Sequence, residues 1–100
     1  MKVENMTSSK GNKIANQFII TSDEPTLVAN DEPKRMVTAQ YFQSYNTIIA
    51  KVKPGFKTRL DHCWDCSCTT SKYRALFLGE STKETRAKIK SGEYILADLN

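Results

Sequence analysis

The alternation of apolar and polar side chains on both sides of Pro54-Gly55 constrains the fold of this chain more than any other feature. Pro-Gly is a turn signal, and the residues on either side of it alternate as in half-buried β-strands. If the loop holds an odd number of residues, the even positions share one face, which predicts core residues Ile48, Ala50, Val52, Leu60 and Trp64. The odd positions then place four cations together on the outer face: Lys51, Lys53, Lys57 and Arg59. A change of one residue in loop length would scatter this cluster, because successive side chains of a strand point to opposite faces.

The first third of the chain gives weaker signals. Residues 1–12 are polar, so we expect a disordered tail, followed by a single domain at residues 13–100. Short strands broken by acidic, proline-containing turns are predicted next: a strand at Ile14–Thr21, a turn at Asp23–Pro25, a strand at Thr26–Ala29 and a turn at Asn30–Pro33.

Helical periodicity begins near residue 70. Tyr73, Leu76 and Phe77 follow the i, i+3, i+4 spacing of an amphipathic helix, and Gly79 fits its end. The start of this helix has three candidate caps, Thr69, Thr70 and Ser71. We expect Trp64 to lie buried beside Leu60 and the Tyr73–Phe77 face, where it would join the sheet to the helices.

A second helix is predicted to begin at Ser81, which stands three residues before Glu84, the spacing of a capping box. Gly92 is its stop signal, and residues 94–96 can form a short last strand or a docked tail. Together these elements predict an α+β fold, in which a small antiparallel β-sheet is followed by two short helices packed on one face.

One short segment holds the residue types of a zinc site: His62, Cys63, Cys66 and Cys68. Structural zinc sites usually join two separated ligand pairs, and a single strand cannot turn four close neighbours toward one ion. We therefore expect semi-buried cysteines without a metal or cofactor, with a zinc-stabilised domain as the alternative. His62 and Cys63 would point to opposite faces of a strand, so we expect no catalytic residue and no enzyme.

The charge of the chain permits an anionic partner without requiring one. Fifteen basic and 11 acidic residues give a net charge of +4. Four cations on one face predict binding to phosphates or to an acidic protein surface. The alternative interpretation is a solvated sheet edge that uses lysine to discourage strand pairing.

Nothing in the sequence predicts a membrane span or a secretory signal. The longest uncharged run, residues 36–50, contains Thr, Gln, Ser, Asn and Tyr, and residues 1–13 are polar. We therefore expect a cytoplasmic protein without a membrane partner.

Residues 40–100 resemble small uncharacterised proteins of phages and mobile elements of Gram-positive bacteria. The resemblance rests on the following segments: YFQSYNTIIA at 41–50, Trp64-Asp65, TTSKY at 69–73, FLGE at 77–80 and IKSGEY at 89–94. The family pattern has an aromatic residue where Cys66 stands and no fixed cysteine at Cys68, which weakens the zinc alternative further.

This resemblance implies a small non-catalytic protein that binds and inhibits a host macromolecule. The most concrete form is a CRISPR-Cas inhibitor (an anti-CRISPR protein), whose partner would be a host protein or ribonucleoprotein such as a Cas effector. Because this chain is basic, DNA mimicry is not expected. The alternative is a basic nucleic-acid-binding module in phage replication or regulation.

Overall fold

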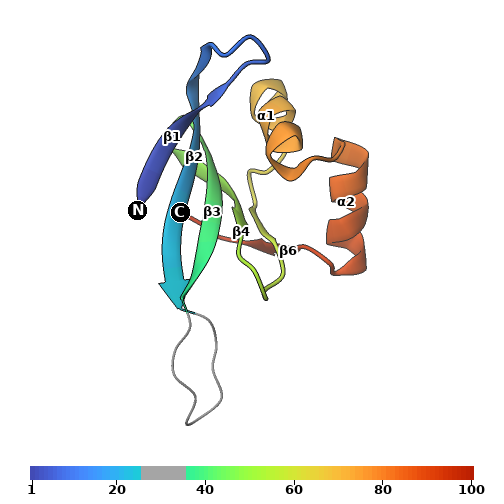
Figure 1. The fold of residues 1–100 in the computed structure, drawn as a ribbon. Helices are drawn as coiled ribbons and strands as arrows, with labels where there is room; N and C mark the ends of the chain where they lie inside the picture. The colour runs from blue at the N-terminus through green and yellow to red at the C-terminus, as the bar shows by residue number, and fades with distance from the viewer. Residues whose placement is uncertain (26–35) are drawn as a thin grey trace.

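The computed structural model describes residues 1–25 and 36–100, which form a six-stranded sheet and two helices (Figure 1). The elements follow in chain order: β1 (Lys2–Thr7), β2 (Lys13–Pro25), β3 (Met36–Ser44), β4 (Thr47–Val52), β5 (Arg59–Asp61), α1 (Cys68–Leu78), α2 (Thr82–Ser91) and β6 (Ile95–Ala97). The strands lie side by side in that same order. The prediction of an α+β fold is therefore confirmed.

The sheet itself differs from the prediction of a small antiparallel one. Strands β1 to β5 pair antiparallel with their chain neighbours, whereas β6 pairs parallel with β5. A parallel pair needs a long crossover, and the segment containing α1 and α2 supplies it. The result is a mixed sheet that includes strands from both ends of the described chain.

The prediction of a disordered tail at residues 1–12 is wrong, because Lys2–Thr7 forms β1 and pairs with β2. Met6 is buried in the core, at a register shift between Asn5 and Thr7 that hides the strand alternation in the sequence. Strand β2 also continues through the expected turn at Asp23–Pro25. The strand predicted at Thr26–Ala29 and the turn at Asn30–Pro33 lie outside the described residues.

A bulge in β4 changes which isoleucine enters the core. Phe42 lies opposite Ala50 while Gln43 lies opposite Ile48, so Ile49 is the extra residue of the pair. Ile49 and Ala50 are consequently both buried, and Ile48 turns to the outer face. The core prediction is correct for Ala50 and Leu60, but it is wrong for Ile48, and Val52 is only half-buried.

Both helices have side-chain caps. Ser67 caps α1 by accepting a hydrogen bond from the Thr70 amide, so the helix starts earlier than the candidate caps predict. Gly79 ends α1 in the left-handed conformation, with a φ of 71°, which favours glycine. The predicted capping box of Ser81 and Glu84 is present in α2.

The core lies between the sheet and side chains of the helix segment. Its buried members come from four strands: Met6, Phe42, Ile49, Ala50 and Leu60. The Phe77 ring of α1 stacks on Phe42 at a centroid distance of 5.8 Å. Figure 1 shows α1 and α2 on the same side of strands β1 to β3. The other side of those strands carries no helix of the described chain.

Trp64 packs against this core, as predicted, but its ring is half-buried rather than buried. The guanidinium carbons of Arg74 and Arg86 lie 4.9 and 5.5 Å from the centre of the indole ring. Arg74 is fully buried and donates a hydrogen bond of 2.6 Å to the Trp64 carbonyl oxygen. Cation–aromatic contact and hydrogen bonding therefore join the turn between β5 and α1, which contains Trp64, to the two helices.

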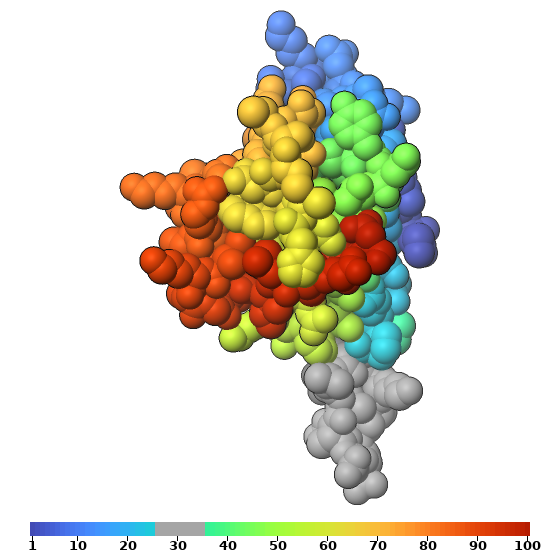
Figure 2. Space-filling model, turned by 180° about the vertical axis from the view of Figure 1, so that it is seen from behind, coloured from blue at the N-terminus to red at the C-terminus, as the bar shows by residue number. Residues whose placement is uncertain are grey.

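Segments that are far apart in sequence meet at the end of the sheet. Figure 2 shows the C-terminal residues (red) beside residues near position 60 (yellow). The buried carboxylate of Asp61 accepts hydrogen bonds from the amides of Cys63 and Leu99, both at 3.0 Å. Although burial opposes ionisation, these hydrogen bonds keep the pKa of Asp61 below its ordinary value.

Candidate functional site

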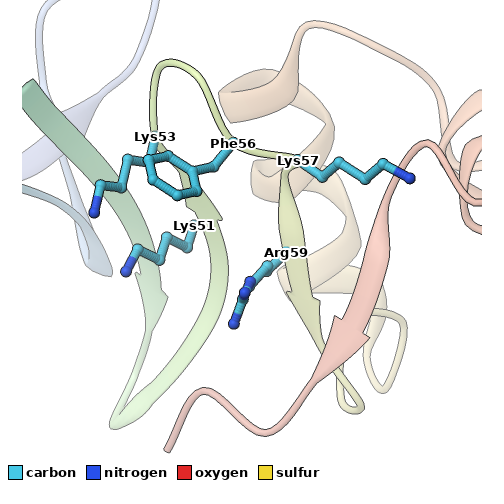
Figure 3. Close-up of a pocket in the computed structure, with 5 residues that line it drawn as sticks. All are labelled: Lys51, Lys53, Phe56, Lys57 and Arg59. Carbon is cyan, nitrogen blue, oxygen red and sulfur yellow. The ribbon is translucent and has the colours of Figure 1, made fainter. Parts of the chain in front are cut away.

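The structure brings all four predicted cations to one hollow beside the β4–β5 turn (Figure 3). The hollow measures about 140 Å³, and we call it the basic hollow, lined by Lys51, Lys53, Phe56, Lys57 and Arg59. Lys51 of β4 lies directly opposite Arg59 of β5, which is the register that the sequence alternation predicts. Strand pairing thus places the cations of two strands on one face.

One half of the basic hollow is fixed by an acidic residue from a distant strand. Glu24 of β2 accepts a hydrogen bond of 3.0 Å from Lys51 Nζ and lies 3.6 Å from Lys53 Nζ. The side chains of Lys51 and Lys53 are only 25% and 14% exposed. These two lysines therefore do not fit the alternative interpretation of a solvated sheet edge, because their charges are paired with Glu24 and their side chains are largely covered.

Tyr41 completes this fixed half. Its hydroxyl donates a hydrogen bond to Glu24, and Lys51 Nζ lies 5.2 Å from the centre of its ring. The Tyr41 hydrogen bond is the main reason that the pKa of Glu24 is lowered, with Lys51 and Lys53 contributing further. Burial and the contact with Glu24 raise the pKa of Tyr41. At neutral pH, Glu24 is thus a carboxylate and Tyr41 a neutral donor.

The other half of the basic hollow is open. Lys57 and Arg59 are exposed, and neither makes an ion pair with a carboxylate in the described ranges. Lys57 Nζ donates a hydrogen bond of 2.9 Å to the Gly92 carbonyl oxygen. Figure 3 shows its side chain extending toward the C-terminal segment, away from Lys51 and Lys53. Arg59 is the cation of the hollow best placed to receive an anionic group from outside.

Phe56 adds an aromatic surface to the hollow. Its ring centre lies 4.5 Å from Lys53 Nζ, and Figure 3 shows the ring beside the Lys53 side chain. An aromatic ring among cations offers a stacking surface as well as positive charge. Sequence reasoning did not assign Phe56 to the site, because it lies in the loop, where strand alternation does not apply.

The basic hollow lies on a stripe of residues that crosses the whole outer face of the sheet. Successive strand pairings align one residue from each strand: Val3, Ile20, Tyr41, Lys51, Arg59 and Ile95. A second hollow, of about 260 Å³, adjoins the apolar part of the stripe, lined by Met1, Ile20, Ser22, Glu24, Tyr41 and Ile48. Glu24 and Tyr41 therefore separate an apolar half on β1–β3 from a cationic half on β4–β5.

The cysteine segment is not part of this surface. Residues 62–65 form turns rather than a strand, and Cys63, Cys66 and Cys68 are all exposed, so the expectation of semi-buried cysteines is wrong. Within residues 1–25 and 36–100, no group of three or more His, Cys, Asp or Glu side chains is arranged to hold a metal ion. The described helices also include none long and apolar enough to cross a membrane.

Glu24 is another site residue that sequence reasoning missed. The sequence places it in an expected acidic turn, 27 positions before Lys51, and no local pattern connects the two. Extending the alternation of β2 past residue 21 places Glu24 on the same face as Ile20, and this is the signal that was available.

Comparison with known families shows that residues 1–93 match the model of a family of unknown function (DUF8033). Searches of curated proteins and of solved structures return no match for the chain.

Proposed function

The chain belongs to DUF8033, a family of unknown function, and we propose that it is a non-catalytic binding protein whose basic hollow binds a negatively charged partner macromolecule. One observation carries this proposal. Lys57 and Arg59 are exposed without a carboxylate partner in the described ranges, beside two lysines already held in place by Glu24. The paired half supplies a rigid base, and the open half supplies charge that a partner can use.

The size of the basic hollow favours a single anionic group over a whole small molecule. Its volume of about 140 Å³ is below the roughly 300–1,000 Å³ of ordinary ligand pockets. A phosphate or carboxylate that projects from a larger partner suits this space. The partner would then extend onto the stripe that leads toward Tyr41 and Ile20.

The resemblance of residues 40–100 to phage and mobile-element proteins supports a partner from the host cytoplasm. The specific form of the proposal is inhibition of a host protein or ribonucleoprotein, with a CRISPR-Cas effector as the first to test. Both the protein and the guide RNA of such a complex present anionic groups.

Direct binding of nucleic acid is the second candidate, and Phe56 is the observation that favours it. A ring that can stack on a base, set among lysines that can contact phosphates, is a combination typical of single-strand binding surfaces. The two candidates differ in salt dependence, because nucleic-acid affinity falls steeply as condensed counterions are released.

The test uses a double variant, Lys57→Glu with Arg59→Glu. The probes are a labelled single-stranded RNA, a labelled DNA duplex and a Cas effector ribonucleoprotein, measured by fluorescence anisotropy at low and moderate salt. We expect the wild-type chain to bind at least one probe and the double variant to bind it at least about tenfold more weakly. A matched control, Lys83→Glu with Lys90→Glu on exposed positions of α2, makes the same change in net charge. Equal affinity of the wild type and the double variant, or equal losses in both variants, would overturn the proposal.

A further inference from the structure

The turn between β5 and α1 contains two cysteines separated by two residues, Cys63 and Cys66. The Cys66 amide donates a hydrogen bond of 3.4 Å to the Cys63 carbonyl oxygen, which closes a turn between them. Such a turn brings the first and fourth Cα atoms within about 7 Å of each other. Cysteines that form disulfides have Cα atoms about 4.4–6.8 Å apart, so the backbone already holds this pair near bonding distance.

The two thiols are also accessible and influence one another. Both residues are exposed. The neighbouring Cys63 thiol is the main reason that the pKa of the Cys66 thiol is raised, and the carboxylates of Asp61 and Asp65 add to the effect. Cys66 is therefore the poorer nucleophile near neutral pH, which makes Cys63 the expected attacking sulfur.

Residues inside the turn are held in place by the helices. The Trp64 carbonyl oxygen accepts a hydrogen bond from Arg74, while Asp65 accepts one of 2.9 Å from Arg86 and one of 2.7 Å from Ser71. Because these contacts fix the backbone between the two cysteines, little chain entropy remains to be lost when the ring closes.

We propose that Cys63 and Cys66 form a reversible disulfide by exchange with a low-molecular-weight disulfide such as oxidised glutathione. The Cys63 thiolate attacks one glutathione sulfur, which forms a mixed disulfide and releases one glutathione thiolate. The Cys66 thiolate then attacks the Cys63 sulfur, which forms the protein disulfide and releases the second glutathione. The protein gives up two protons and two electrons, and the glutathione disulfide takes up both as its own bond breaks.

Cys68 provides the matched control. It is also exposed, but it is the first residue of α1 and lies outside the Cys63–Cys66 turn. A Cys68→Ser variant should therefore keep the disulfide, whereas Cys63→Ser and Cys66→Ser should each lose it. All three substitutions are at exposed positions, so the variants are expected to fold, which circular dichroism checks.

The experiment incubates the wild type and the three variants with oxidised glutathione, then alkylates the remaining thiols and measures intact mass. We expect the wild type to retain one alkylatable thiol and Cys68→Ser to retain none. Apart from the added alkyl group, the mass of each oxidised protein should differ from that of its reduced form only by the hydrogens lost when the disulfide forms. Dithiothreitol should restore every thiol. Peptide mapping without reduction should recover Cys63 joined to Cys66.

Several outcomes would overturn this inference. Three free thiols in the oxidised wild type, under conditions that oxidise a control dithiol peptide, would show that the pair does not close. A bond that includes Cys68, or stable glutathione adducts in place of an internal bond, would be equally decisive against it. The readout is independent of partner binding, so it stands whether or not the basic hollow has the function proposed above.

Discussion

Two neighbouring rows of residues cross the sheet, and they differ by a single position in each strand. The inner row includes Ile19, Phe42, Ala50 and Leu60, and its last three side chains are completely buried. The outer row includes Ile20, Tyr41, Lys51 and Arg59, and it changes from apolar to cationic between β3 and β4.

The difference between the rows comes from what covers them. The described helix side chains that pack on the core reach the inner row, as Phe77 does on Phe42. This packing constrains the size and shape of each inner residue. The outer row is free of that constraint, so its residues are available for charge pairing and for a partner.

The largest effect is expected from the substitution Phe42→Ala. Phe42 is fully buried and stacks on Phe77, so its loss removes apolar burial and leaves a cavity. We expect a loss of about 3–5 kcal/mol in the free energy of unfolding. Urea denaturation followed by circular dichroism measures it. Tyr41→Ala, one position along the same strand, serves as the outer-row control and should cost clearly less. Equal losses of unfolding free energy in Phe42→Ala and Tyr41→Ala would contradict the difference between the inner and the outer row.

Within the outer row, Lys51→Glu should destabilise the protein more than Arg59→Glu. The Lys51 substitution places a second carboxylate beside Glu24, whose side chain is 19% exposed, and we expect a loss of roughly 1–3 kcal/mol. Arg59 is exposed, so its substitution should change stability by less than about 0.5 kcal/mol. Thermal melts of the two single variants test this difference. A glutamate variant at all four cations is thus a poor test of binding, because it would also disturb the fold.

Acid should weaken the fixed half of the basic hollow. The folded pKa of Glu24 lies below its ordinary value of 4.5, so its contribution to stability is fully present above that value and is lost as the pH falls through the folded pKa. Asp61 and Glu80 have lowered pKa values too, so the informative quantity is a difference between variants. The stability of Glu24→Gln should fall less than that of the wild type between about pH 6 and about pH 3, by at most about 1 kcal/mol. Parallel pH profiles of the two proteins would contradict this account.

The smallest expected effect is that of a chelator. If packing alone holds the inner row, purified protein should contain no stoichiometric zinc, and EDTA should leave its melting temperature unchanged. Elemental analysis and a thermal melt check this. One zinc per chain together with chelator-induced unfolding would show instead that the exposed cysteines that follow β5 help to hold the inner row.

Features determined by local chemistry could be predicted from the sequence. The capping box of α2 depends on residues three positions apart, and the pairing of Lys51 with Arg59 depends on a short loop. Both arise within a few residues of Ser81 or of Pro54-Gly55, so pattern and propensity determine them.

Features determined by distant contacts could not be predicted in this way. The bulge at Ile49 turns Ile48 to the opposite face from the one that strict alternation predicts, and no glycine or proline in the sequence marks its position. Strand β1 consists largely of polar residues and is stabilised by pairing with β2 and by the burial of Met6. Glu24 reaches the candidate site only because β2, β3 and β4 lie side by side.

The parallel pairing of β5 with β6 has a consequence for the order of folding. Arg59 pairs with Ile95 across the whole segment that holds α1 and α2, whereas each earlier pair joins strands that follow one another in sequence. Contacts between distant residues carry the larger loop-closure entropy and slow the search. We therefore expect the antiparallel strands to assemble before β6 docks, so that the sixth strand completes an existing sheet.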